Sequence, residues 1–321
     1  MFKNKEGRVR SGWKIAFMMG ASLTIIGIIS SIVSFLVTVI LISNGDFDYQ
    51  LLTYTERGNQ VMNLTYTLLS FLQEIVLIVT PIIAWKVIMR RPLSNMGLTS
   101  IKQHNKELIV GLLFGMISIS IVFVLLILTG NARVVTWTPR FSIQQLIYLF
   151  LYIMVGFAEE IFGRGYIMSV LRQTRNVPVI IIISSIIFAL LHGLNPGIGL
   201  LPCINLFLVG VLFAYMYIKS GNLWMCIGYH ITWNYFQGYI YGFKVSGTDT
   251  VGIITTEFET SNLFNGGAFG PEGGLFVTLV ILAGFLYVRM YYKNLDYDFI
   301  ASEPTSELIP QPEPENIYSE M

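Results

Sequence analysis

Long apolar stretches, separated by short polar segments, follow one another through most of the chain. A membrane-spanning helix needs about 20 consecutive apolar residues. Eight stretches are candidates, and the fifth is the weakest because it is short and contains serines. They cover roughly 15–42, 64–89, 107–129, 142–160, 178–193, 199–218, 222–242 and 273–293. The pattern predicts an all-α fold, a polytopic membrane bundle of about eight transmembrane helices.

Composition supports a membrane protein. Hydrophobic residues make up 54% of the 321 residues and charged residues only 12%, against about 25% charged residues in a soluble domain. No basic patch with interleaved aromatic residues occurs, which disfavours nucleic-acid binding. Cys203 and Cys226 lie in apolar stretches without a Cys-x-x-Cys pattern, so buried thiols are expected, although their spacing leaves a disulfide open.

The distribution of charge predicts the orientation. Most basic residues fall on one side of an eight-span protein: Lys3, Lys5, Arg8, Arg10, Lys14, Arg90, Arg91, Lys102, Arg172, Arg175, Lys219, Arg289 and Lys293. The few basic residues of the opposite loops, Arg57, Arg133, Arg140 and Lys244, do not overturn this bias. The opposite loops carry acidic residues: Asp46, Asp48, Glu56, Asp249, Glu257, Glu259 and Glu272. Because cytoplasmic loops are enriched in Lys and Arg, we expect a multi-pass protein of the cell membrane with both termini in the cytoplasm. The first apolar run is too long for a cleaved signal peptide.

Four parts of the chain are distinguished by composition and by the position of candidate site residues. A tail rich in Pro and Glu cannot bury a core, and we expect it to be disordered. The loop 244–272 is rich in Gly, Thr and Asn, and is either a mobile cap over a site or a plain solvated loop. The predicted division is 1–141 for the first three spans, 142–242 for a membrane core, 243–293 for an extracytoplasmic loop and the last span, and 294–321 for the tail.

Two adjacent carboxylates, Glu159 and Glu160, lie in an apolar stretch and are followed by Arg164. A carboxylate in the membrane costs about 2–3 kcal/mol even on the mildest scale, and such residues usually carry function. Glu160 and Arg164 are four residues apart and share a helix face, whereas Glu159 lies about 140° away from Arg164. We therefore expect a structural Glu160 and a reactive Glu159. The alternative is a charge cluster at a helix end.

Two of the three histidines also lie in apolar stretches. Phe188 and His192 share one helix face, and so do His230 and Asn234. Alone, His192 could be an interfacial packing residue, and His230 with Asn234 could be a polar clamp between helices. Their occurrence together with paired carboxylates favours a common site.

Other polar residues within the spans are Glu74, beside Gln73 in the second stretch, and Asn205 in the sixth. Glu74 must be paired, protonated or exposed to a cavity, and a structural role is favoured.

The depth of these groups poses a conflict. With the fourth span ending near residue 160, Glu159 and His192 would lie at opposite membrane faces. The fifth stretch, however, covers only about 22 Å at 1.5 Å per residue, which is short of the hydrocarbon core of about 30 Å. We therefore expect the fourth span to continue past Arg164, and the site to be a water-filled cavity inside the bundle.

Together these groups could hydrolyse a peptide bond without a serine or cysteine nucleophile. A carboxylate and an imidazole can activate a water, and a second histidine with an asparagine can stabilise an oxyanion. Two histidines and a glutamate could instead hold catalytic zinc, but the chain has no His-Glu-x-x-His helix. We expect no cofactor, and zinc is the competing hypothesis.

Glu-Glu-x-x-x-Arg, Phe-x-x-x-His and His-x-x-x-Asn occur in this order at 159–164, 188–192 and 230–234. The set resembles the CAAX-protease and bacteriocin-processing family (CPBP, or Abi), which includes the type II CAAX prenyl endopeptidases. The resemblance covers about 142–242. It implies that Glu159 and His192 activate water, that Glu160 pairs with Arg164, with Phe188 as a supporting residue, and that His230 and Asn234 form the oxyanion hole.

The resemblance implies an intramembrane endopeptidase acting on a membrane-associated peptide or a lipidated protein, with the lipid bilayer as its other partner. One alternative is a non-catalytic membrane scaffold or bacteriocin-immunity protein with the same fold. Another is a transporter that uses Glu74 and Glu159 as a proton relay, which the lack of inverted repeats disfavours. The sequence carries no signature of an oligomeric state.

Overall fold

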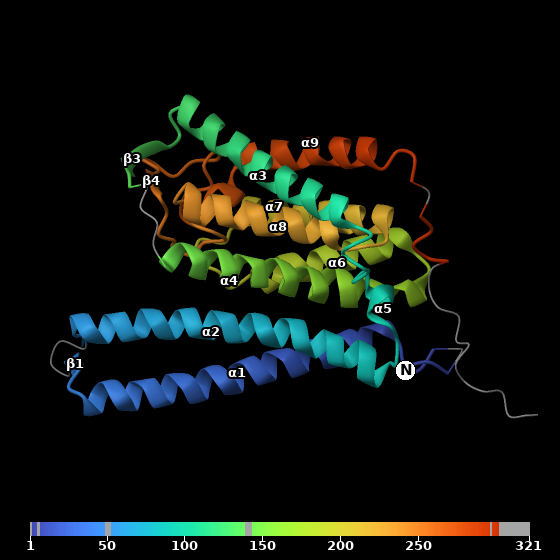
Figure 1. The fold of residues 1–321 in the computed structure, drawn as a ribbon, viewed down its shortest axis with the longest axis horizontal. Helices are drawn as coiled ribbons and strands as arrows, with labels where there is room; N and C mark the ends of the chain where they lie inside the picture. The colour runs from blue at the N-terminus through green and yellow to red at the C-terminus, as the bar shows by residue number, and fades with distance from the viewer. Residues whose placement is uncertain (1, 5–6, 49–52, 139–142, 296, 302–321) are drawn as a thin grey trace, which may run out of the picture.

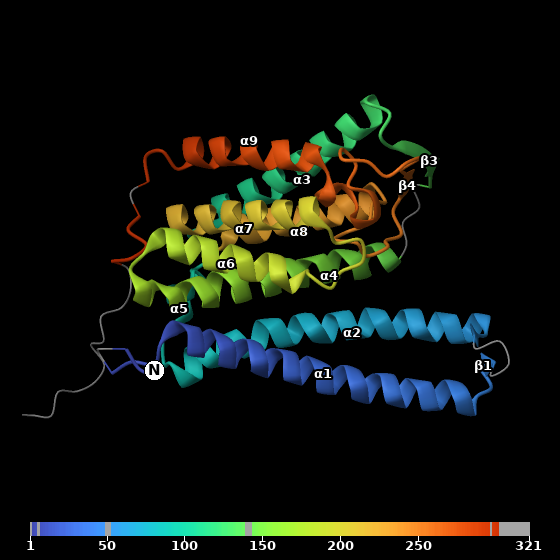
Figure 2. The ribbon, with the colours of Figure 1, turned by 180° about the vertical axis from the view of Figure 1, so that it is seen from behind.

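A computed structural model describes residues 2–4, 7–48, 53–138, 143–295 and 297–301. The described chain is an all-α bundle, as predicted. Its helices lie side by side, with the N-terminus at one end and the short strands at the other (Figures 1 and 2). Two antiparallel pairs of strands occur, β1 (Phe47–Asp48) with β2 (Thr53–Tyr54) and β3 (Arg133–Trp137) with β4 (Ile254–Glu257).

Each of the eight apolar stretches coincides with a helix. The helices are α1 (Ser11–Ser43), α2 (Glu56–Ile83), α3 (Asn105–Leu128), α4 (Ile143–Glu160), α6 (Val177–Leu191), α7 (Leu200–Ser220), α8 (Trp224–Asn234) and α9 (Leu275–Tyr291). Among the described residues, five helical segments are long and apolar enough to cross a membrane: Ser11–Ser43, Glu56–Ile88, Asn105–Leu128, Ile143–Thr174 and Leu200–Ser220. The number of eight spans stays a prediction.

The fourth helical segment does not end near residue 160. α4 continues through a π-helical segment (Ile161–Met168), α5 (Ser169–Leu171) and a 3-10 turn, Arg172–Thr174. The span boundary at 160 was wrong, and the expectation that the helix runs past Arg164 is confirmed. The reason is that Arg164 is fully buried and paired with Glu160, so its charge does not mark a helix end at the membrane surface.

α6 returns from this end of the bundle to the depth of Glu159. Asn176 caps its N-terminus by accepting a hydrogen bond of 3.1 Å from the Val179 backbone N–H. The 15 residues of α6 rise about 22 Å, and α6 packs against the π-helical segment that follows Glu160. The short fifth stretch therefore brings His192, the residue after α6, back to the middle of the bundle.

Glycines allow α3 and α8 to approach closely. A Cβ atom added to Gly111 or Gly115 of α3 would clash with the backbone of α8, and one added to Gly228 of α8 would lie 2.6 Å from the Leu108 carbonyl oxygen. Small residues at a spacing of four are typical of close helix pairs in membranes. This contact fixes the helix that carries His230.

Replacing Gly115 by Leu should therefore destabilise the fold. The added side chain overpacks the α3–α8 contact, and overpacking costs about 1–3 kcal/mol. Gly20→Leu on α1 is the matched control, because nothing lies within 4 Å of a Cβ there and the gain in helix propensity is the same. We expect a lower unfolding temperature in detergent for Gly115→Leu alone. Equal unfolding temperatures for the two variants would contradict the close packing.

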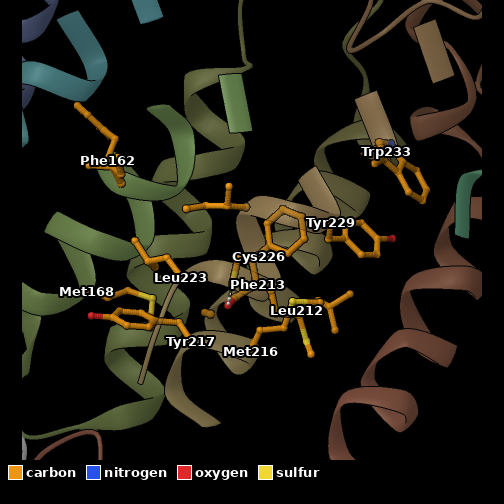
Figure 3. Packing of buried hydrophobic residues seen from close by; sticks show 14 of the residues in the cluster. Phe162, Met168, Leu212, Phe213, Met216, Tyr217, Leu223, Cys226, Tyr229 and Trp233 are labelled. Carbon is orange, nitrogen blue, oxygen red and sulfur yellow. Dashed lines mark hydrogen bonds between the residues drawn. The ribbon is translucent and has the colours of Figure 1, made fainter. Parts of the chain in front are cut away.

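The core lies between α7, α8 and the helical segment after Glu160. Figure 3 shows Met168, Phe213, Met216 and Tyr229 packed around the buried Cys226. Both cysteines are free thiols, Cys226 buried and Cys203 partly exposed. α1 lies at the edge of the bundle beyond α2 (Figure 1), and only 6% of its most apolar stretch is buried in the protein. Its side chains are thus left for lipid.

Two segments, the loop 244–272 and the tail from 294, contain packed residues that the sequence did not predict. Loop 244–272 contains β4, and Asn265 and Phe269 within it are fully buried, so it packs onto the bundle. The predicted disordered tail begins with packed residues, since Phe299 is 2% exposed and the Arg172 guanidinium lies 4.0 Å from its ring. Residues 302–321 of that tail lie outside the described residues.

Candidate active site

Histidines from two other helical segments approach Glu159. Its Oε2 atom lies 3.8 Å from Nε2 of His192 and 3.9 Å from Nε2 of His230. These separations exceed a direct hydrogen bond, and Oε2 is buried without a hydrogen-bond partner among the described residues. A water molecule between the three groups could bond to all of them. The structure thus brings together the three residues that the sequence placed in one site.

The protonation of both imidazoles follows from their partners. Nδ1 of His192 lies 2.9 Å from the Phe188 carbonyl oxygen, which can only accept, so Nδ1 carries the hydrogen. Nδ1 of His230 lies 3.0 Å from Oε1 of Glu160, and it likewise donates to this carboxylate. Each histidine therefore directs its Nε2 atom towards Glu159, an orientation set by the second nitrogen.

Glu160 and Arg164 form a buried support beneath this group. Both side chains are fully buried, and Nη1 of Arg164 donates to Oε1 of Glu160 over 3.1 Å. The guanidinium carbon lies 4.2 Å from the ring of Phe188 and 5.0 Å from that of Phe213, a cation–π arrangement. The predicted pair is present. Glu160 also accepts a hydrogen bond from His230, a contact that the sequence could not indicate. This bond links the Glu160–Arg164 pair to the group around Glu159.

Asn234 lies one helical turn after His230 on α8 and lines the same cavity. It is 6% exposed, and no hydrogen bond of its side-chain amide occurs with the described residues. The amide is therefore available to donate to a bound molecule. The geometry keeps His230 and Asn234 on one face, as their spacing predicts.

A cavity of about 250 Å³ adjoins these residues. Three of its lining residues are exposed: Gln73 on α2, and Thr248 and Asp249 in the loop after α8. The lining includes Ser70, Gln73 and Glu74 of α2; Tyr148, Leu151, Tyr152, Val155 and Glu159 of α4; Phe188 and His192; Asn205, Leu206, Val209 and Phe213 of α7; Tyr229, His230, Trp233 and Asn234 of α8; and Asn195, Ser246, Thr248, Asp249, Thr250 and Glu272. The site is thus a cavity inside the bundle, as expected.

Glu272 is a cavity residue that sequence reasoning missed. It lies in the turn before α9, where Ser246 donates to its Oε2 atom through its backbone N–H and, over 3.0 Å, through its hydroxyl. Burial raises the pKa of Glu272 above its ordinary value, and the hydrogen bonds from Ser246 oppose the rise. The carboxylate holds segment 245–250 over the cavity. In sequence it resembled any acidic loop residue.

The two other polar residues within the spans have different surroundings. Asn205 donates to the Glu272 and Gly274 carbonyl oxygens over 2.7 and 3.0 Å, and accepts from Thr278, so it joins α7 to the start of α9. Glu74 lines the cavity. Its polarity was visible in the sequence, but the face of α2 that packs against α4 was not.

The donor atoms of the described residues around Glu159 do not form a metal site. In the described part of the chain, no group of three or more His, Cys, Asp or Glu side chains has an arrangement suited to a metal ion. Glu159, His192 and His230 have the donor chemistry of a zinc site, and their separations suit a shared water.

Part of the chain matches a known protein family. Residues 140–236 match the family model described as type II CAAX prenyl endopeptidase Rce1-like. No curated protein and no solved structure matches the chain. All seven site residues named from the sequence lie within the matched segment: Glu159, Glu160, Arg164, Phe188, His192, His230 and Asn234. Residues 140–236, which hold the candidate site, are thus similar to the Rce1-like type II CAAX prenyl endopeptidases.

Proposed function

We propose that this protein is an intramembrane endopeptidase in which a water held by Glu159 and His192 attacks a peptide bond, with His230 and Asn234 as donors to the oxyanion. The observation that supports this most strongly is the approach of two Nε2 atoms to one carboxylate oxygen, at 3.8 and 3.9 Å. The match of residues 140–236 to type II CAAX prenyl endopeptidases supports a membrane protease of this class. The proposed substrates are membrane-associated peptides or lipidated proteins.

The reaction begins when Glu159 takes a proton from the water and His192 orients it through Nε2. The water oxygen bonds to the carbonyl carbon, and the carbonyl oxygen becomes an oxyanion. Nε2 of His230 and the Asn234 amide donate to that oxyanion. Because Nδ1 of His230 already donates to Glu160, donation through Nε2 requires the imidazolium form, which the two flanking carboxylates stabilise. The carbon–nitrogen bond then breaks, and the proton on Glu159 passes to the leaving amine.

The proposed orientation of the protein in the membrane rests on the distribution of charged residues between the two ends of the bundle. The loops rich in Lys and Arg connect helices at the end of the bundle where the N-terminus lies, and the acidic loops lie at the strand end (Figure 1). By the positive-inside rule, the N-terminal end is cytoplasmic. Two of the three exposed lining residues, Thr248 and Asp249, belong to the loop at the strand end, so substrate would enter from the extracytoplasmic half.

Comparative membrane peptidomics of cells with the wild-type protein and cells with Glu159→Gln tests the activity. We expect product peptides only with the wild type, and uncleaved precursors to accumulate with the variant. Glu257→Gln on the exposed β4 strand is the control and should match the wild type. Identical peptide profiles for wild type and Glu159→Gln would favour a scaffold or immunity protein instead.

We further predict that activity needs no tightly bound metal. Glu159 and His192 can hold and polarise a water by themselves, and His230 is needed as a donor to the oxyanion. Elemental analysis of the purified protein should find zinc far below one ion per chain, and dialysis against a strong chelator should leave activity unchanged. Stoichiometric zinc that disappears together with activity in His192→Ala would support the metalloprotease hypothesis.

A further inference from the structure

The cavity carries more acidic groups than the proposed reaction uses. As far as the described residues show, its lining holds four carboxylates and no Lys or Arg. Asp249, which is exposed, is paired with Lys244 over 2.9 Å, and Glu272 accepts hydrogen bonds from Ser246. Glu159 has the catalytic position. Glu74 is left as a carboxylate with no assigned role.

Glu74 lines the same cavity as the catalytic carboxylate. Its helix, α2, packs beside α4, the helix that carries Glu159 (Figure 1). Glu159 and His230 are near enough to interact electrostatically with Glu74. A molecule bound at the catalytic residues would therefore also meet Glu74.

The Glu74 carboxylate is buried and incompletely bonded. Its residue is 5% exposed, and its Oε1 atom accepts one long hydrogen bond of 3.3 Å from Gln73. Its Oε2 atom has no hydrogen-bond partner among the described residues. A buried carboxylate without a partner is costly, and in a membrane such residues pair or face a cavity. Without a ligand a proton or water must satisfy Oε2, whereas a cation in the cavity would pair with it.

We propose that Glu74 binds a cationic group of the substrate, an ammonium or guanidinium, next to the bond that is cleaved. This rests on the proposed function, because it describes the substrate of the same site. A charge-assisted hydrogen bond to Oε2 completes the bonding of Glu74. The nearby Glu159 adds to the attraction of a cation. Glu74 lies outside the segment 140–236 that matches the family, so this selectivity is a feature of α2 in this chain.

Binding to Glu159→Gln protein, which should not cleave, tests the proposal in detergent. The probes are an N-acetylated, C-amidated octapeptide of Ala and Leu with one Lys scanned through its positions, the same peptides with norleucine in place of Lys, and a norleucine peptide with a free amino terminus. The intrinsic fluorescence of tryptophan, including Trp233 in the cavity, reports binding. The last two probes distinguish a side-chain cation from an α-amino group.

With Glu74 present, we expect one or more Lys positions, or the free amine, to bind about 10- to 100-fold more tightly than the blocked norleucine peptide. Glu74→Gln should abolish that preference and leave norleucine binding unchanged. Glu257→Gln, the control, should keep it. Glu74→Met is a second variant, and both variants should be at least as stable as the parent because they remove an unpaired buried carboxylate.

An equal preference with and without Glu74, or no preference in the parent, would overturn the cation site. Cleavage is measured separately with Glu159 intact, so the two proposals can fail independently. A protein that shows the Glu74-dependent preference but never cleaves a bound peptide would overturn the endopeptidase function alone. A protein that cleaves Lys and norleucine peptides equally well would overturn the role of Glu74 alone.

Discussion

Replacing Glu159 by Gln should slow peptide hydrolysis by roughly 10²–10⁴-fold, the usual contribution of a general base. The amide has nearly the same shape as the carboxylate but cannot take a proton from water. Glu159 makes no ion pair with Arg164 and is partly exposed to the cavity, with 23% of its side chain accessible. Expression, membrane insertion and the unfolding temperature should therefore stay close to those of the wild type.

The rate is measured with the purified proteins in detergent, on a precursor identified by peptidomics. Glu257→Gln should retain the full rate, since Glu257 pairs with Arg133 on the exposed strand pair. Full turnover by Glu159→Gln would remove Glu159 from the mechanism. A loss of activity accompanied by a loss of folded protein would leave the catalytic role without support.

Replacing Glu160 by Gln should instead destabilise the protein by about 3–5 kcal/mol, the cost of leaving a buried charge unpaired. Arg164 would lose its carboxylate partner in a site with no solvent exposure. His230 would lose the anion that accepts from its Nδ1 atom. The free energy of unfolding, measured in mixed detergent and dodecyl sulfate micelles, should fall accordingly.

The double variant Glu160→Gln with Arg164→Met is the matched control for this effect. Removing both charges avoids an unpaired cation, and replacement of a whole buried ion pair is often neutral. We therefore expect the double variant to be more stable than Glu160→Gln alone. A stable but inactive Glu160→Gln, together with an active Glu159→Gln, would mean that the two glutamates have exchanged roles.

The sequence predicted the residues of the site but not all of their contacts. The spacing of four residues was sufficient for Glu160 with Arg164 and for His230 with Asn234, because one helix turn brings such pairs onto one face. The bond between Glu160 and His230 joins α4 to α8. Such a contact depends on how the helices pack, and helical spacing carries no information about it.

Glu74 illustrates the same limit. A carboxylate in the second apolar stretch was evident, and a structural role was the favoured interpretation. Whether it faced lipid, a neighbouring helix or the cavity depended on the rotation of α2 against α4. Glu272 was harder still, because a loop residue becomes buried only when other segments, such as the one that carries Ser246, pack against it.

The predicted end of the fourth span at residue 160 was wrong for a physical reason. A run of Glu, Glu and Arg ordinarily marks the membrane surface, yet here the charges neutralise one another inside the bundle. The length of the fifth stretch indicated the correct boundary. Its 15 residues are too few to cross the hydrocarbon core, so the stretch must end near the middle of the membrane.

Cysteine labelling and cross-linking test most directly whether Glu159, His192 and His230 share one water-filled cavity. Cys203 and Cys226 are first replaced, and single cysteines are placed at 159, 192 and 230. All three should react with a charged, membrane-impermeant thiol reagent added from the side opposite the termini. A short bifunctional thiol reagent should join 159 to 192 and 159 to 230. It should not join 159 to 190, because Leu190 lies near His192 on α6 with a side chain turned outward, 71% exposed. Labelling of 159 and 192 only from opposite sides, or equal cross-linking to 190, would contradict a shared water and with it the proposed hydrolysis.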